Sequence, residues 1–66
     1  MTNTRLLKAK IVESGKTYRE LAKELHISET SLRNKVNNKA FFRLREIVEL
    51  CKILDITDKD TYFFAE

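Results

Sequence analysis

The sequence contains few of the residues that metal sites, disulfides and catalytic centres require. Its 66 residues include one cysteine and one histidine, which excludes an internal disulfide and a zinc site made of several thiolates. A nucleophile, a base and an orienting residue cannot be assembled from His26 and Cys51, which belong to unrelated segments. We therefore expect a protein that is not an enzyme and that uses no metal and no cofactor.

Proline is absent and glycine occurs once, so the chain has few residues suited to tight hairpin turns. The commonest residues are leucine, lysine and glutamate, which favour helices. A hydrophobic content of 42% is typical of globular proteins, and 66 residues leave room for one core. The composition predicts a single all-α domain over residues 1–66.

Long apolar runs are also absent. The N-terminal segment MTNTRLLKAK has no hydrophobic signal core, and no stretch approaches the roughly 18 apolar residues that a membrane-spanning helix needs. We expect a soluble, cytoplasmic protein with neither a membrane nor a small molecule as its partner.

Capping residues and the spacing of apolar residues predict five helices. They cover about residues 4–14, 18–25, 29–37 and 44–54, followed by one or two turns after Thr57. The first helix is expected to begin behind Thr2 or Asn3 and to end at Gly15, a left-handed cap residue. Thr17 and Glu20 have the spacing of a capping box, which predicts the start of the second helix.

Similar signals define the later helices. Ser28 is the expected N-cap of the third helix, and Thr57 with Asp60 repeats the capping-box spacing before the last one. The fourth helix carries apolar residues at helical spacing, which predicts a buried stripe made of Ile47, Leu50, Cys51 and Leu54.

The second and third predicted helices are short and only about three residues apart, which is the layout of a helix-turn-helix. The segment TYRELAKELHISETSLRNKVNNK resembles the DNA-binding helix-turn-helix of the phage Cro and repressor family, also called the XRE family. The family's small helix-contact residue corresponds to Ala22, its turn hydrophobe to Ile27 and its third-helix core residue to Leu32. The segment EIVELCKILDI is similar to the family's fourth helix. The resemblance implies a compact five-helix, lambda-repressor-like DNA-binding domain with its helix-turn-helix at about residues 17–37.

The chain departs from this family at three places. His26 stands where most members have glycine, so we expect a turn residue with positive φ there. Ile11 and Val36 replace an Arg–Glu ion pair of many members, and we expect the two apolar side chains to be buried and in contact. Asn37 and Asn38 replace a frequent glycine after the third helix, where asparagine is the next best left-handed cap residue.

Charge is distributed unevenly along the chain. Residues 1–39 contain nine Lys or Arg and four Glu, a net charge of +5, whereas residues 40–66 contain four bases and six acids, a net charge of −2. Between Thr30 and Arg45 there is no acid and there are five cations: Arg33, Lys35, Lys39, Arg43 and Arg45. Such a cationic stretch favours contact with a phosphate backbone, although short cationic runs also occur as ordinary solvated surface.

A helical projection of the third helix predicts which side chains face DNA. At about 100° per residue, the buried direction lies between Leu32 and Val36. The side of the helix opposite this direction is expected to face the DNA. The predicted base-reading residues lie on that side, on its flank, or at the first helical position: Glu29, Thr30, Arg33, Asn34 and Asn37. Asparagine can pair with adenine, arginine with guanine, glutamate with the cytosine amino group, and threonine can contact the thymine methyl. The family resemblance places base contacts at Glu29, Thr30 and Asn34.

A second group is predicted to contact DNA phosphates, because helix N-termini present free amides and hydroxyls and lysine and arginine supply charge. This group is Thr17, Tyr18, Ser28, Ser31, Lys35, Asn38, Lys39 and Arg43. Thr17 and Ser28 are also explained as helix caps whether or not DNA is bound, so both roles stay open.

Five of the six aromatic residues lie outside the predicted helix-turn-helix. A core this small cannot easily bury all of them, so we expect one or two of the last three rings to remain at the surface as an apolar patch. The predicted protein interface is therefore Tyr62, Phe63 and Phe64. Its partner would be a second copy, forming a homodimer, or a partner phage repressor.

These features together predict a sequence-specific transcriptional regulator of the Cro or repressor type, from a phage or prophage, that reads the major groove of double-stranded operator DNA. The alternative is a protein-interaction modulator that binds and inactivates a partner phage repressor. The salt dependence of DNA binding separates the two, because a DNA-reading protein releases counterions from the phosphates it contacts.

Overall fold

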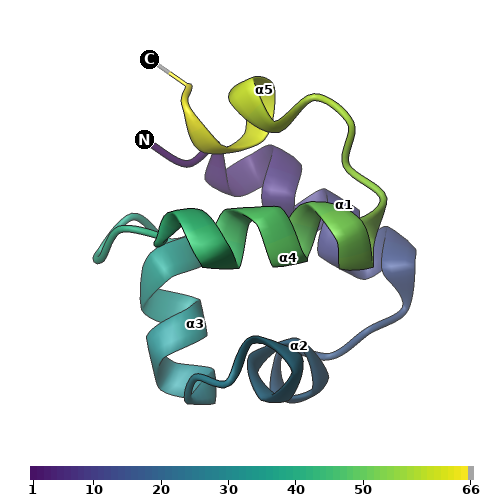
Figure 1. Ribbon diagram of the computed structural model, residues 1–66, viewed down its shortest axis with the longest axis vertical. Coiled ribbons are helices and arrows are strands. Elements are labelled where there is room, and N and C mark those ends of the chain that lie inside the picture. The colour runs from purple at the N-terminus through teal and green to yellow at the C-terminus, as the bar shows by residue number, and fades with distance from the viewer. Residues whose placement is uncertain (66) are drawn as a thin grey trace.

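Helices form where the sequence combines helical apolar spacing with capping residues, and the computed structural model, which describes residues 1–65, contains five of them. They are α1 (Thr4–Ser14), α2 (Tyr18–Leu25), α3 (Glu29–Val36), α4 (Leu44–Leu54) and α5 (Lys59–Phe63) (Figure 1). The described residues outside the helices form turns and loops and no strand. The predicted all-α, five-helix fold class is confirmed.

Local capping explains where the first helices begin and end. The Asn3 side chain accepts a hydrogen bond from the Leu6 amide at 3.1 Å, so Asn3 rather than Thr2 caps α1. Gly15 then takes the left-handed conformation, with φ of 75°. Thr17 and Glu20 form the expected capping box of α2, through bonds of 3.1 Å and 2.9 Å.

Two later helix ends differ from the sequence prediction. α5 is capped by Asp58 rather than Thr57, because the Asp58 carboxylate accepts the Thr61 amide at 3.3 Å and the helix begins one residue later. α3 ends at Val36 instead of continuing through Asn37. The left-handed residue after α3 is Asn38, with φ of 63°.

The core is built from the apolar faces of all five helices and from Ile56, in the loop between α4 and α5. Its buried residues are Leu7, Ile11, Leu21, Ala22, Leu25, Leu32, Val36, Ile47, Leu50, Leu54, Ile56 and Phe63. The prediction that Ile11 and Val36 are both buried is confirmed. Cys51 is only half-buried at the edge of the α4 stripe, and desolvation raises the pKa of its thiol.

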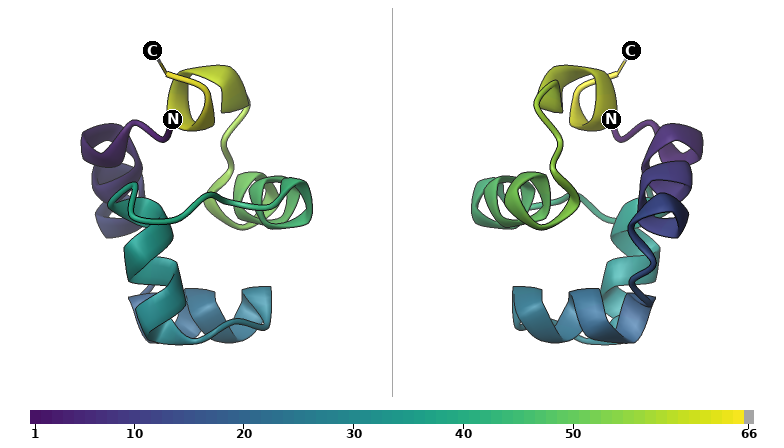
Figure 2. Two further views of the ribbon diagram at one scale, coloured as in Figure 1. Left: turned by 90° about the vertical axis from the view of Figure 1, so that its left-hand side faces the viewer. Right: turned by 90° about the vertical axis from the view of Figure 1, so that its right-hand side faces the viewer.

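The helices are arranged so that α2 and α3 lie at one end of the molecule, while α5 and the N-terminal residues lie at the other (Figures 1 and 2). α4 lies across the middle of the molecule, between these two ends, and contacts α1, α2 and α5 (Figure 1). The amide of Asn3 donates to the Tyr62 carbonyl at 2.7 Å, which holds the N-terminal segment against α5. None of the described helices is both long and apolar enough to cross a membrane.

Candidate nucleic-acid interface

The turn between α2 and α3 sets the angle of α3. His26 adopts a left-handed conformation with φ of 60°, as expected for the position where the resembling family has glycine. The following amide, of Ile27, donates to the Ala22 carbonyl at 3.0 Å. Ser28 then caps α3 by accepting the Ser31 amide at 3.0 Å. The chain therefore changes direction within three residues, and α3 crosses α2 steeply (Figure 2).

The outer side of α3 is polar and faces away from the core. Leu32 and Val36 are fully buried, and helical periodicity places Thr30 and Asn34 on the opposite side. Of the predicted base-reading residues, Thr30, Arg33 and Asn37 are exposed, and Glu29 and Asn34 are half-buried. α3 thus carries hydrogen-bonding side chains that are exposed or half-buried, in addition to its buried Leu32 and Val36.

Three of the predicted DNA-contacting residues form a network at the start of α3. The Arg33 guanidinium donates to the Glu29 carboxylate at 2.7 Å. Its central carbon also lies 4.5 Å from the centre of the Tyr18 ring, in a cation–π contact. A second arginine, Arg19, lies 3.9 Å from the other Glu29 oxygen. Glu29 and Tyr18 therefore both contact Arg33 in the protein without DNA.

Two asparagines after α3 bond to the protein itself. The Asn37 side chain donates to the Arg33 carbonyl at 2.9 Å and so caps the end of α3. The Asn38 side chain accepts the Thr2 amide at 2.9 Å and donates to the Thr2 carbonyl at 2.8 Å. Asn38 therefore ties the N-terminal segment to the end of α3, and this structural role was missed by sequence reasoning.

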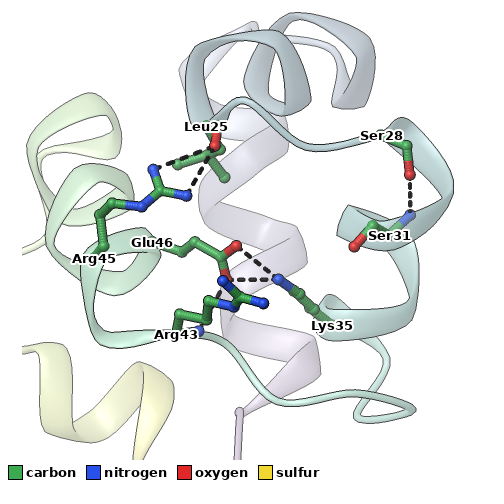
Figure 3. A network of polar contacts seen from close by, with 7 residues as sticks. All are labelled: Leu25, Ser28, Ser31, Lys35, Arg43, Arg45 and Glu46. Atoms are coloured by element: carbon green, nitrogen blue, oxygen red, sulfur yellow. Dashed lines mark hydrogen bonds and ion pairs between the residues drawn. The ribbon is translucent and has the colours of Figure 1, made fainter.

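Lys35 does not lie where the sequence predicts it, among the residues that contact DNA phosphates. Its Nζ donates to both carboxylate oxygens of Glu46 at 2.7 Å (Figure 3). The side chains of Lys35 and Glu46 are only 10% and 1% exposed. Lys35 points into the fold because this buried carboxylate attracts it, so it is not a phosphate contact in this structure.

The first turn of α4 holds both helices of the helix-turn-helix. Glu46 accepts the Arg43 amide at 2.8 Å in addition to the Lys35 ammonium. Burial pushes the pKa of Glu46 upward, but the Arg43 amide and the Lys35 ammonium outweigh burial and keep the pKa below its ordinary value. Arg45 donates to the Leu25 carbonyl, at the end of α2, at a distance of 3.4 Å (Figure 3). Sequence reasoning missed Glu46 because an acid at the third helical position is also explained by capping alone.

The remaining predicted phosphate contacts lie at the starts of α2 and α3 or in the segment between α3 and α4. Lys39 and Arg43 are exposed in the segment between α3 and α4. Thr17 and Ser28 are exposed and serve as helix caps, while Ser31 is half-buried. Exposed cations therefore follow α3 in the chain, and capped helix N-termini lie at the starts of α2 and α3.

The predicted protein interface is only partly at the surface. Phe64 is 51% exposed, but Phe63 is 4% exposed and packs edge-on against Phe42 with ring centres 5.4 Å apart. The inclusion of Phe63 in the interface is therefore wrong, because its ring belongs to this chain's own core. Phe41, which sequence reasoning did not place in the interface, is 89% exposed. Together with Met1 and Phe64, it lines a shallow pocket.

Comparison with known proteins assigns a family to the chain. No curated protein and no solved structure matches it. The profile of the family DUF739, described as "Protein of unknown function", matches residues 2–66. Because this match covers nearly the whole sequence, the chain belongs to the DUF739 family.

Proposed function

We propose that this protein binds double-stranded operator DNA in a sequence-specific manner and regulates transcription as a Cro-like or repressor-like protein. The observation that carries the proposal is the helix-turn-helix in which α3 turns one side to the core and an exposed polar side outward. A helix of this kind fits the major groove, where side-chain amides, guanidinium groups and hydroxyls can distinguish base pairs.

The distribution of charge supports the same proposal. Of the five cations between Thr30 and Arg45, Lys35 is neutralised internally and Arg33 pairs with Glu29. Lys39, Arg43 and Arg45 remain exposed, and Arg45 also donates to the Leu25 carbonyl. The N-terminus of α2 adds backbone amides that suit phosphate. We therefore expect a modest number of phosphate contacts, with base contacts supplying much of the discrimination.

Selection of bound duplexes from a random pool, followed by titration between about 50 and about 200 mM salt, tests the proposal. The slope of log K against log salt should be about −0.9 for each phosphate contacted, and a consensus sequence should emerge. The Lys39→Ala variant should make the slope less steep without changing the consensus sequence. Failure to bind any duplex at the lowest salt concentration would contradict the proposal.

A second candidate function is favoured by the exposed apolar residues. Met1, Phe41 and Phe64 are each more than half exposed and line one pocket, and contiguous exposed apolar residues often mark protein-binding surfaces. The protein would then act as a modulator that binds and inactivates a partner phage repressor. The same residues also suit a homodimer, which would place two copies of α3 about 34 Å apart on DNA.

A further inference from the structure

We infer that Arg33 reads a guanine in the operator and that Glu29 and Tyr18 are positioning residues, which hold the Arg33 guanidinium for that contact. This inference rests on the proposed function and specifies how one base pair is recognised. It replaces the prediction that Glu29 reads a base of its own and that Tyr18 contacts a phosphate.

The guanidinium is held from two directions. Glu29 accepts a hydrogen bond from Nη2 of Arg33 at 2.7 Å, one helical turn before it. The guanidinium also lies over the Tyr18 ring, at the start of α2, with 4.5 Å between the ring centre and Cζ. The contacts come from two different helices, so they define the position of the guanidinium more narrowly than either contact alone.

Each contact alone would be weak. An ion pair between exposed side chains contributes little because water and salt screen it. An acid four residues before a base is the favourable order along a helix, and the tyrosine ring adds a cation–π attraction to the same guanidinium. Both contacts remove rotational freedom from Arg33 before DNA binds, which lowers the entropic cost of the base contact.

The atoms that remain unused on Arg33 suit guanine. A guanidinium has five N–H donors, and the Glu29 bond uses one from Nη2. The remaining donors include a pair that can bond the O6 and N7 atoms of guanine, which is the commonest specific contact in the major groove. Arg33 is also more than half exposed, so DNA can approach it.

Glu29 is poorly placed to read a base independently. One of its oxygens accepts from Arg33 and the other lies 3.9 Å from Arg19. A bond to a cytosine amino group would compete with these two cations. The two arginines also neutralise a carboxylate that DNA phosphates would otherwise repel, so Glu29 can remain beside DNA as a support for Arg33.

The test measures binding of single-base variants of the selected duplex to Arg33→Ala, Glu29→Ala and the double variant. Arg33→Ala should lose between about 5-fold and about 150-fold discrimination at one G·C pair. Glu29→Ala should weaken discrimination at the same G·C pair, and the double variant should lose no more discrimination than Arg33→Ala alone. The inference would be overturned if Arg33→Ala and Glu29→Ala each lost discrimination at a different base pair and the two fold-losses multiplied in the double variant. That result would still be consistent with sequence-specific binding.

Tyr18 offers a matched pair of variants. Tyr18→Phe keeps the ring and should leave affinity and specificity unchanged, whereas Tyr18→Leu should relax the pair that Arg33 reads. A uniform loss in Tyr18→Phe for all sequences would show a phosphate contact through the hydroxyl and overturn the role assigned to Tyr18. Asn34→Ala serves as the control, because it should relax a different base pair.

A measurement on the protein without DNA separates this inference from the proposed function. The side-chain protons of Arg33 nearest the guanidinium should be shielded by the Tyr18 ring in NMR spectra, and the shielding should disappear in Tyr18→Leu. Absence of that shielding in the wild type overturns the inference even where binding is sequence-specific. A wild type that keeps the shielding but binds no duplex overturns both the proposed function and the guanine contact.

Discussion

The ammonium of Lys35 lies 2.7 Å from each carboxylate oxygen of Glu46 and joins the last turn of α3 to the first turn of α4. Both side chains are almost completely removed from water. The carboxylate also accepts the Arg43 amide, so one buried acid fixes the end of α3 and the start of α4 together. A buried charge pair therefore ties the last turn of α3 to the first turn of α4.

Replacing one member of the Lys35–Glu46 ion pair should destabilise the protein more than replacing both members. Glu46→Gln keeps an oxygen for the Arg43 amide but leaves the Lys35 charge buried without its counterion, which should cost about 3 to 5 kcal/mol. Adding Lys35→Met should recover part of that loss, because the uncompensated charge is then removed. Urea denaturation of the two single variants and the double variant gives the coupling free energy. Additive losses would contradict a direct interaction.

The pH dependence of stability should report the same carboxylate. The pKa of Glu46 is lower in the folded protein than its ordinary value of 4.5, so its contribution is complete above the ordinary pKa and is lost as the pH falls through the folded pKa. The stability difference between wild type and Glu46→Gln should therefore be constant near neutral pH and shrink below about pH 4.5. Thermal melts of both proteins across this range measure it. A difference that stays constant down to about pH 3 would argue against a depressed pKa.

Sequence reasoning succeeded where the determining contacts are local. The Thr17 and Glu20 capping box and the Ser28 cap each involve residues three apart, so spacing alone predicts them. Glu46 is eleven residues from Lys35, and a helical projection assigns a lysine to solvent whenever its partner lies on another helix.

The C-terminal aromatics illustrate the same limit. Tyr62, Phe63 and Phe64 are consecutive, and the choice of which ring enters the core depends on how α5 docks. The Asp58 cap sets the start of that helix one residue later than the Thr57 spacing predicts. A five-residue helix carries too little periodicity to identify its buried face from sequence. The structure was needed to separate Phe63 in the core from Phe64 at the surface.

Substitutions at Ile11 and Val36 test whether these two side chains contact each other. They occupy the positions where many members of the Cro and repressor family have an ion pair. Val36 is completely buried and Ile11 is 3% exposed. Val36→Ala should cost about 1 to 3 kcal/mol and Ile11→Ala about 2 to 5 kcal/mol, through lost transfer free energy and the cavity left behind. Denaturant melts of both variants and their double variant measure these values. Losses that add in the double variant would show that the two side chains do not contact each other.

Phe64→Asp tests the exposed apolar surface. The substitution should leave the fold intact, because half of the ring is already exposed, but it should abolish self-association or binding to a protein partner. Val12→Asp is the matched control, since Val12 is also exposed but lies in the last turn of α1. Sedimentation at several concentrations, with and without DNA, measures both variants. A wild type that is monomeric under all of these conditions, and whose mass shifts with a partner repressor, would favour the modulator over the homodimer.

Base-pair discrimination by Asn34 tests the central claim most directly, because Asn34 lies opposite the buried side of α3. Binding of wild type, Asn34→Ala and Lys39→Ala should be measured against every single-base variant of the selected duplex. Asn34→Ala should lose about 1 to 3 kcal/mol at one base pair and keep its preferences elsewhere, whereas Lys39→Ala should weaken all sequences equally. A uniform loss for Asn34→Ala, or a wild type without sequence preference, would contradict the account that α3 reads operator DNA.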